Sequence, residues 1–487
     1  MPRRLSLLIV VAAWVAIYLP GLGTLEIKGE EGRRILPAVS MLHTGNYLVP
    51  QVGSEPYFRK PPLVNWLVAG SFKLFGRRDE WAARLPSALC VLAVALAFVL
   101  IARGSLGAVG SLAGALVWMT NLGVLEKGRL IEIEALYASL CGLAIVCWLS
   151  WFWDKRSPWL TWIVPWIFLG LGWLAKGPVH LVFFYAVVVG VLWKTKQLRA
   201  LASSQHLLGI LVMLGIFAAW AIPCLLMMQG GDVAHIWSRQ FSGRLSGEDF
   251  HFRGWLLNIP RGLGYFLPWT LLLFFANRAH FADPRTGAIA RGLLWGIALS
   301  FLGVNLLPGS LARYTMPLLA PAVWLVAMLL TADRFEIAPW LNLQRPAALP
   351  AALRWPALVT ALSCFVIALY AFAFMPALKG REKTRPMAAQ INAALTPGAL
   401  LYAVDPDYQP FLFYVRDPIA YVDQVTEVPA NARYLLVQKA REPEAIASAH
   451  WQPRQAHRLL AFKDYRGKEV VVLQVGEGNE SVPIPGR

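Results

Sequence analysis

Acidic and basic side chains that could do chemistry stand between long apolar runs of the chain. The first such stretch holds the adjacent acids Glu30 and Glu31, which could bind a cation or serve as a general base. Further on, Arg59 and Lys60 precede two prolines, and the fixed φ of proline stiffens the backbone at this cation. A lipid phosphate is a natural partner for Lys60. The alternative interpretations are that the acidic pair lies in an ordinary solvated loop and that Lys60 is an ordinary snorkelling lysine.

Two further charged sites stand at the edges of apolar runs. Glu134 begins one run, after a stretch that contains Lys127, Arg129 and Glu132. An ionisable group there is a candidate functional residue, although an acid also caps helix N-termini. Lys176 occupies a Lys-Gly-Pro turn between two apolar runs. So short a turn predicts that the lysine faces a cavity or an interior partner, or anchors a helix at the interface.

Later in the chain, arginines recur in two more stretches. Arg239, Arg244 and His251 lie in the polar segment 229–261, and Arg313 precedes Tyr314. Two or three arginines that converge on one point would suit a phosphate or a diphosphate. His251 could be a metal ligand or a base, although a lone histidine is more often neither.

The elements that carry these residues are predicted to be membrane-spanning helices. The 487 residues are 57% hydrophobic and 15% charged, against roughly 45–50% apolar and 25% charged in soluble domains. Apolar runs of roughly 18–22 residues match a hydrocarbon core of about 30 Å. With the short apolar piece 62–76 as an interfacial helix or a further span, a polytopic α-helical membrane protein of about 11–13 spans is expected. The predicted spans are 5–22, 83–102, 106–122, 136–153, 159–175, 179–193, 206–228, 262–277, 291–307, 315–331 and 355–375.

Basic loops favour a cytoplasmic N terminus, although the outer loops are basic too, and the candidate residues then share the outer side of the membrane. From about residue 376 the composition changes to short β-like runs at 399–404, 433–438 and 470–475, with an amphipathic helix at 386–395. This pattern predicts a small soluble α/β domain. We therefore expect a membrane domain at 1–375, whose first outer loop 23–82 contains interfacial helices, and an outer domain at 376–487.

Charge and cysteine usage exclude some classes of protein. The net charge of +17 fits basic loops between spans and attraction to anionic lipid. Nucleic-acid binding is not expected, because the basic residues stand in short loops. The five cysteines lie in apolar segments and are expected to be free thiols. Met1–Leu22 lacks a small-residue cleavage site and is interpreted as an uncleaved first span.

Taken in order, these motifs resemble a known family. The order is the acidic pair, K-P-P at 60–62, Arg129 to Glu134, K-G-P at 176–178, P-W at 268–269 and R-Y-x-x-P at 313–317. It resembles the lipid-linked-sugar glycosyltransferases of the GT-C superfamily, in the branch of the lipid A aminoarabinose transferase and the protein mannosyltransferases. The resemblance covers residues 5–330, approximately.

The resemblance implies a bacterial inner-membrane enzyme that takes a sugar from a polyprenyl (undecaprenyl) phosphate. Glu30 would activate the acceptor, and Glu134 would hold the second acidic position. The expected catalytic set is Glu30, Glu31 and Glu134, and the expected lipid-phosphate ligands are Arg59, Lys60, Lys176, Arg239, Arg244, Arg313 and Tyr314. The family usually has Asp at the position of Glu30 and Glu at that of Arg59. The second departure removes a plausible metal ligand, so a divalent metal cofactor is left open, with His251 as a candidate ligand.

Two other functions compete with this hypothesis. A transporter or flippase of a lipid-linked sugar would show inverted repeats and polar residues near mid-membrane, and the sequence shows no internal repeat. A non-catalytic assembly module would not explain why acids and cations share one side. The expected enzyme acts as a monomer on a lipid A, glycan or protein acceptor, which the sequence does not distinguish.

Overall fold

The structure, a computed structural model, describes residues 1–53, 55–57, 60–228, 250, 252–335, 350–416, 418–451, 454–464 and 467–476. The chain divides into two compact units. Unit 1 consists of Met1–Leu22 with Phe58–Pro376, and unit 2 of Gly23–Tyr57 with Ala377–Arg487. The segment 23–57, predicted to belong to the first outer loop of the membrane domain, thus packs with the C-terminal part of the chain.

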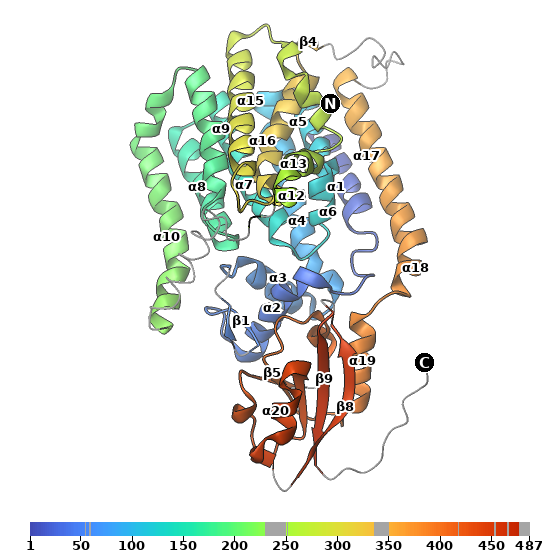
Figure 1. Ribbon diagram of the computed structural model, residues 1–487. Helices are drawn as coiled ribbons and strands as arrows, with labels where there is room; N and C mark the ends of the chain where they lie inside the picture. The colour runs from blue at the N-terminus through green and yellow to red at the C-terminus, as the bar shows by residue number, and fades with distance from the viewer. Residues whose placement is uncertain are drawn as a thin grey trace. The chain divides into compact units, whose positions relative to one another are not determined.

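Unit 1 is a bundle of helices (Figure 1). A two-stranded antiparallel ribbon of β3 (Ala279–His280) and β4 (Arg334–Phe335) lies within it. A π-helical turn at Tyr370–Phe374 joins the last long helix to α18 (Met375–Lys379), at the boundary between the units. The other α-helices among the described residues of this unit are α1 (Arg3–Tyr18), α3 (Leu63–Phe75), α4 (Glu80–Leu100), α5 (Arg103–Thr120), α6 (Leu122–Lys127), α7 (Ile133–Trp153), α8 (Pro158–Ala175), α9 (His180–Lys194), α10 (Ser204–Met227), α12 (Phe252–Leu256), α13 (Asn258–Tyr265), α14 (Thr270–Phe274), α15 (Pro284–Asn305), α16 (Leu319–Leu330) and α17 (Ala351–Leu369).

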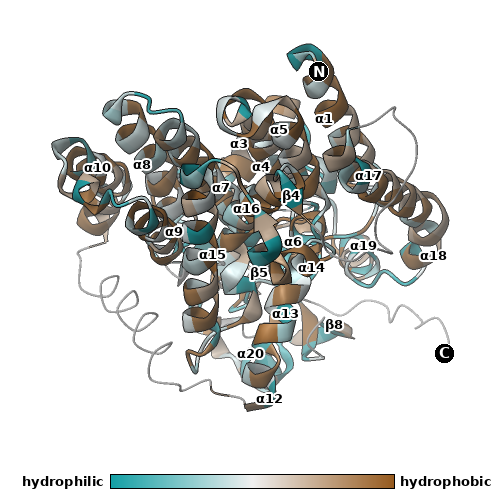
Figure 2. Cartoon of the chain, turned by 90° about the horizontal axis from the view of Figure 1, so that it is seen from above, coloured by the Kyte–Doolittle hydropathy of each residue, from teal (hydrophilic) through white to brown (hydrophobic). Residues whose placement is uncertain are grey.

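Seven helical segments among the described residues are long and apolar enough to cross a membrane, and α3 and α9 are shorter apolar helices. This confirms the predicted multi-pass α-helical membrane fold. In their most apolar windows, α7 and the continuous segment Ala312–Leu330 are 83% buried, whereas α10 and Ala351–Lys379 are 22% buried. Hence α7 and α16 form the centre of the bundle, while α10 and α17 turn apolar surface outward, as lipid-facing helices do (Figure 2).

Most predicted spans coincide with a helix, but the span at 262–277 does not. This stretch forms the two short helices α13 and α14. Pro268 lies between them, and proline supplies no backbone N–H to continue a helix. The piece 62–76, predicted as an interfacial helix or short span, forms the 13-residue α3.

Small residues let α9 and α15 pack backbone to backbone. A Cβ atom on Gly190 would lie 2.4 Å from the carbonyl oxygen of Gly292, and one on Gly296 would lie 2.5 Å from that of Ala186. Gly292 and Gly296 have the GxxxG spacing that permits close helix approach in membranes. Because α9 starts directly after the Lys176 turn, this packing also fixes the position of that turn.

Unit 2 contains a five-stranded mixed sheet in the order β6-β5-β7-β9-β8. Strand β5 (Leu401–Val404) is parallel to β6 (Ile419–Val422) and to the central strand β7 (Tyr434–Gln438), and β9 (Glu469–Val475) is antiparallel to β7 and to β8 (Ala456–Lys463). The predicted β-like runs coincide with β5, β7 and β9, and the predicted helix with α19 (Thr384–Ala394). The unpredicted strands β6 and β8 are the two edges of the sheet. Strand β6 is a run of only four half-buried residues, and exposed positions interrupt the apolar run of β8.

The carboxylate of Glu26 joins the N-terminal part of unit 2 to its C-terminal part. Glu26 is buried, and its oxygens accept the backbone N–H groups of Lys383, Thr384 and Arg385 at 3.0, 2.7 and 3.0 Å. These are the donors at the start of α19, where a negative charge is favoured. The same segment continues into α2 (Gly32–Thr44) and the hairpin of β1 (Gln51–Val52) and β2 (Glu55–Pro56).

Candidate active site

Glu134, Lys176 and Arg313 meet at one end of unit 1. Glu134 lies in the first turn of α7, Lys176 is the C-terminal cap of α8, and Arg313 stands in the 3-10 helix Ala312–Leu318. Lys176 Nζ lies 3.3 Å and Arg313 Nε 3.5 Å from Glu134 Oε1. The side chains of Glu134 and Lys176 are 11% and 14% exposed, so their charges are screened less than those of a surface pair.

Two tyrosine rings flank the Lys176 ammonium. Lys176 Nζ lies 4.8 Å from the ring centre of Tyr314 and 5.4 Å from that of Tyr137, within the range of cation–π attraction. Tyr314 follows Arg313, and Tyr137 lies one turn after Glu134 on α7. Each of these two elements thus supplies one charged group and one ring. The structure thus brings together four residues that the sequence singled out, Glu134, Lys176, Arg313 and Tyr314. Their catalytic and binding roles stay predictions.

The formal charges at this point are one carboxylate against two cations. The excess positive charge is partly exposed, because the side chain of Arg313 is 40% exposed. An arginine and a lysine side by side can bind a phosphate through charge-assisted hydrogen bonds. The site can therefore accept an anion that would share, or take over, the cations now paired with Glu134.

A second ion cluster lies on the loop before α7. Lys127 Nζ lies 2.9 Å from Glu126 Oε1 and 3.1 Å from Glu132 Oε2. Burial raises the pKa of the Glu132 carboxyl; Lys127 lowers it, and the charge of Glu134 raises it further. Burial alone would lower the pKa of Lys127, but its bonds to Glu126 and Glu132 outweigh burial and the net pKa is raised. Glu132 is thus a second carboxylate within electrostatic reach of Glu134.

Arg129, the first residue of the R-x-x-x-x-E motif, has a structural role. It is 9% exposed, and its guanidinium donates to the backbone carbonyls of Ile17 and Pro20. Arg84 donates to the carbonyl of Leu22 at 3.0 Å. Both arginines satisfy carbonyl groups at and just beyond the C-terminal end of α1, where a cation is favoured. The motif therefore joins a structural arginine to a site carboxylate.

The other predicted residues of the site fall in different places. Lys60 lies in unit 1, half-buried, just before the buried Pro61 and Pro62, and it is not without an interaction partner. Its role as a phosphate ligand stays a prediction. Arg59, Arg239, Arg244 and His251 lie outside the described residues.

The acidic pair belongs to unit 2. Glu30 is exposed, and its Oε2 lies 3.1 Å from Arg33 Nη1. Arg33 in turn stacks on the Tyr408 ring, with its guanidinium carbon 3.7 Å from the ring centre. Glu31 is 3% exposed, and its Oε2 accepts the backbone N–H of Lys28 at 3.4 Å. Of the pair, Glu30 is the one whose carboxylate faces solvent, and the catalytic roles of both stay predictions.

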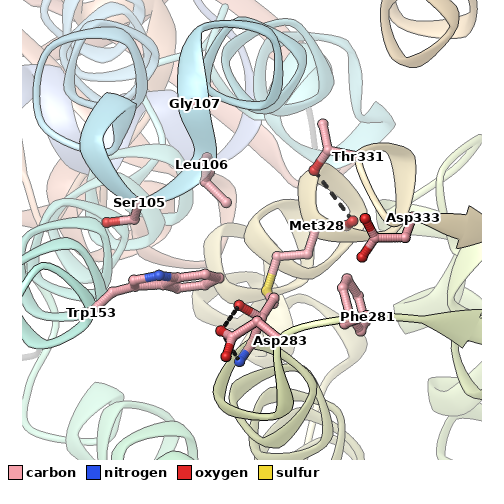
Figure 3. A pocket seen from close by; sticks show the side chains of 10 residues that line it. Ser105, Leu106, Gly107, Trp153, Phe281, Asp283, Met328, Thr331 and Asp333 are labelled. Atoms are coloured by element: carbon pink, nitrogen blue, oxygen red, sulfur yellow. Dashed lines mark hydrogen bonds between the residues drawn. The ribbon is translucent and has the colours of Figure 1, made fainter.

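A separate hollow of about 300 Å³ lies near the other end of α7 (Figure 3). Trp153 lines it, and Trp153 and Glu134 stand near opposite ends of this 21-residue helix, roughly 30 Å apart. The carboxylate of Asp283 in this hollow caps α15 by accepting the N–H groups of Arg285 and Thr286, and Asp333 accepts the N–H of Ala282. The acids of the hollow thus serve the local backbone.

The part of the chain that the structure describes contains no cluster of side chains that could bind a metal ion. There, no group of three or more His, Cys, Asp or Glu side chains is gathered closely enough to hold an ion. The sequence candidate His251 is outside that part, so a divalent metal stays an open prediction.

Sequence comparison places the chain beside transferases that use lipid phosphates. The family profile described as dolichyl-phosphate-mannose-protein mannosyltransferase matches residues 59–222. The undecaprenyl phosphate-alpha-4-amino-4-deoxy-L-arabinose arabinosyl transferase 1 of Pseudomonas fluorescens is 28% identical over 339 residues, which cover 67% of this chain and 60% of the relative. The corresponding transferase of Pseudomonas aeruginosa (strain LESB58) is 24% identical over 513 residues, covering 99% and 90%. The chain thus spans 60% of the length of the first relative and most of the second.

Comparison of structures defines the fold. The crystal structure of ArnT from Cupriavidus metallidurans bound to undecaprenyl phosphate matches with a TM-score of 0.67 at 18% identity, covering 96% of this chain and 97% of that one. The apo form matches with a TM-score of 0.65. The fold is therefore that of the GT-C membrane glycosyltransferases. The resemblance predicted from the motifs is confirmed, and the chain is similar to the undecaprenyl phosphate-aminoarabinose transferases in particular.

Sequence reasoning missed several residues around the site. Tyr137 and His180 lie in apolar runs and were not singled out, although Tyr137 stands at the i+3 position from Glu134 on the same helix. That spacing puts both side chains on one helix face and was the one available indication. Glu132 and Lys127 were noted as part of a charged loop, but their pairing depends on how the loop folds.

Proposed function

We propose that this chain is a glycosyltransferase that moves a sugar from undecaprenyl phosphate to an acceptor at the outer face of a bacterial inner membrane. The observation that carries the proposal is the cluster of Glu134, Lys176 and Arg313, in which two cations converge on one partly buried carboxylate. The relatives are named as undecaprenyl phosphate-aminoarabinose transferases, and the structural relative was crystallised with undecaprenyl phosphate. Both support a polyprenyl phosphate sugar as donor.

The chemistry needs a base and a cationic site for the leaving group. An acceptor hydroxyl oxygen attacks the anomeric carbon, and the bond from that carbon to the phosphate oxygen breaks. The electron pair stays on the phosphate, whose growing charge Lys176 and Arg313 would stabilise. The hydroxyl proton passes to a carboxylate, the role that the resemblance gives to Glu30. A single displacement of this kind inverts the anomeric centre.

The membrane orientation, the acceptor and the monomeric state are proposals that rest on the sequence. The basic loops favour a cytoplasmic N terminus, which would place the Glu134 end of unit 1 and the C-terminal sheet of unit 2 in the periplasm. The acceptor would be lipid A, another glycan or a protein, and the enzyme would act as a monomer. Lys60, Arg59, Arg239 and Arg244 would add cations to the phosphate site.

The proposal is tested with purified protein in lipid nanodiscs. The donor is undecaprenyl phosphate-4-amino-4-deoxy-L-arabinose, the acceptor is lipid A, and mass spectrometry detects the modified acceptor. Lys176→Ala is expected to lower transfer by about 100-fold or more, the usual effect of removing one group that stabilises transition-state charge. Glu134→Gln is expected to lower transfer as well, because Lys176 and Arg313 lose the carboxylate that pairs with them. Lys194→Ala, at the far end of α9, is the matched control and should keep full activity.

The outcome also separates the enzyme from a flippase. Full transfer by both Lys176→Ala and Glu134→Gln would rule out this site. Movement of the labelled donor across vesicle membranes without any modified acceptor, tried with lipid A, glycan and protein acceptors in turn, would favour the transporter instead.

A further inference from the structure

The turn that carries Lys176 is held from behind by two buried side chains. Tyr137 on α7 is 3% exposed, and His180, the first residue of α9, is 0% exposed. Tyr137 Oη lies 3.0 Å from the carbonyl oxygen of Gly177 and accepts the backbone N–H of His180 at 2.6 Å. One hydroxyl thus binds both the turn and the start of the next helix.

The two ring nitrogens of His180 connect α8, the Lys176 turn and α7. Its Nε2 lies 2.8 Å from the carbonyl oxygen of Leu169. Its Nδ1 lies 3.0 Å from the carbonyl oxygen of Gly177 and 3.0 Å from Tyr137 Oη. Because a carbonyl only accepts, each of the two neutral tautomers donates to one of these carbonyls. The hydroxyl is central to a network that spans α7, α8 and α9.

Two glycines make room for this network. A Cβ atom on Gly172 would lie 2.9 Å from His180 Nε2, so the bare backbone of α8 lets the imidazole reach Leu169. Gly177 has φ +124°, in the region that only glycine adopts without strain. The backbone after Lys176 therefore takes a path that requires glycine at position 177.

From these contacts we propose that Tyr137 and His180 are positioning residues that set where the Lys176 ammonium lies. Glu134 and Tyr137 are one turn apart on α7, so one helix face supplies both the carboxylate that pairs with Lys176 and the hydroxyl that binds the backbone following it. The Tyr137 ring also lies beside the ammonium. The register of α7 against the turn thereby determines the direction of the lysine. The catalytic consequence rests on the proposed function, whereas the position of Lys176 does not.

Tyr137→Phe removes the hydroxyl and keeps the ring, so it tests the hydrogen bonds of Tyr137 separately from the packing of its ring. The chain offers a matched control: Tyr185 Oη lies 2.8 Å from His206 Nε2, a second tyrosine–histidine pair in the same unit. Tyr185→Phe loses the same kind of bond away from the Lys176 turn. Melting temperatures of both variants report whether each remains folded.

The first readout is independent of activity. An amine-reactive reagent labels the folded protein, and mass spectrometry follows the peptide that contains Lys176. Loosening the turn should raise the Lys176 labelling rate about two- to tenfold in Tyr137→Phe, the range that the loss of one hydrogen bond allows, and leave it unchanged in Tyr185→Phe. An unchanged rate in Tyr137→Phe, or an equal rise in both variants, overturns the proposal.

The second readout is a double-mutant cycle on transfer from the undecaprenyl phosphate sugar. Tyr137→Phe should lower transfer about two- to tenfold, and the double variant with Lys176→Ala should be no worse than Lys176→Ala alone. Additive losses would mean that Tyr137 does not act through Lys176 and would also overturn the proposal. If Lys176→Ala transfers normally, the proposed function of the site fails, and the labelling result alone then decides whether the two residues position the lysine.

Discussion

The Lys176 ammonium lies 3.3 Å from the Glu134 carboxylate, although 42 positions separate the two residues in the sequence. The contact forms because α7 and α8 pack against each other and the turn after α8 returns to the start of α7. Arg313 reaches the same carboxylate from a third element. The K-G-P motif, the R-Y-x-x-P motif and the glutamate of the R-x-x-x-x-E motif are therefore parts of one ion cluster, in which two cations pair with Glu134.

Arg313 is expected to contribute to phosphate affinity. Arg313→Ala removes one cation from the cluster, so its affinity for undecaprenyl phosphate should fall about tenfold, as for the loss of one charge-assisted hydrogen bond. The loss should shrink at high salt, because this side chain is partly exposed and screened. A binding titration in detergent at two salt concentrations checks both statements. Arg199→Ala, an exposed arginine beside α10, should bind normally, and equal losses in the two variants would contradict the prediction.

Stability should depend on pH through Glu132. Its pKa is raised in the folded protein above the ordinary value of 4.5 by burial, so the folded state holds this proton more tightly than the unfolded state. The resulting stabilisation is full below about pH 4.5 and is lost as the pH rises through the folded pKa. Glu132→Gln removes this loss, so its melting temperature should fall less between acid and neutral pH than that of the natural protein. Glu444→Gln, at an exposed position of α20 (Glu442–Ala447), should reproduce the natural curve.

Glu26 is expected to stabilise unit 2. Glu26→Gln keeps the size of the side chain but loses its charge, so the three N–H groups at the start of α19 keep a weaker partner. The free energy of unfolding should drop by about 1–3 kcal/mol. Hydrogen exchange at the amides of Thr384 and Arg385 should quicken as well. Unchanged exchange at these two amides would show that the carboxylate does not hold the segment 23–57 in place.

Gly296 is expected to tolerate no side chain. Gly296→Ala would place a Cβ atom 2.5 Å from the carbonyl of Ala186, which forces α9 and α15 apart and should cost about 1–3 kcal/mol. Gly303→Ala on the same helix meets no atom within 4 Å and should be neutral or stabilising by up to about 1 kcal/mol. Thermal unfolding of both variants in one detergent measures the difference. Equal melting temperatures would mean that the helices can separate at no cost.

The amino-acid sequence determined the membrane class, most helices and the identity of the three charged residues Glu134, Lys176 and Arg313. Apolar runs of spanning length require helices, because a backbone in lipid must satisfy its own hydrogen bonds. The span predicted at 262–277 was wrong, because Pro268 interrupts the helix there and the apolar composition of the run does not reveal this. In unit 2 the interior strands have continuous apolar runs and were predicted, whereas the edge strands β6 and β8 were not. Strand β6 is only four residues long, and β8 has charged residues at exposed positions.

Tertiary structure decided which charged residues work together. Arg129 and Glu134 belong to one motif, yet Arg129 serves the end of α1 while Glu134 pairs with Lys176 and Arg313. Tyr137 and His180 look like ordinary residues of apolar helices until α7, α8 and α9 pack and leave their polar atoms facing the Lys176 turn. The sequence sets the period at which side chains emerge from a helix, and thereby the shared face of Glu134 and Tyr137. Which partner that face meets depends on contacts between segments far apart in the chain, and only packing fixes those.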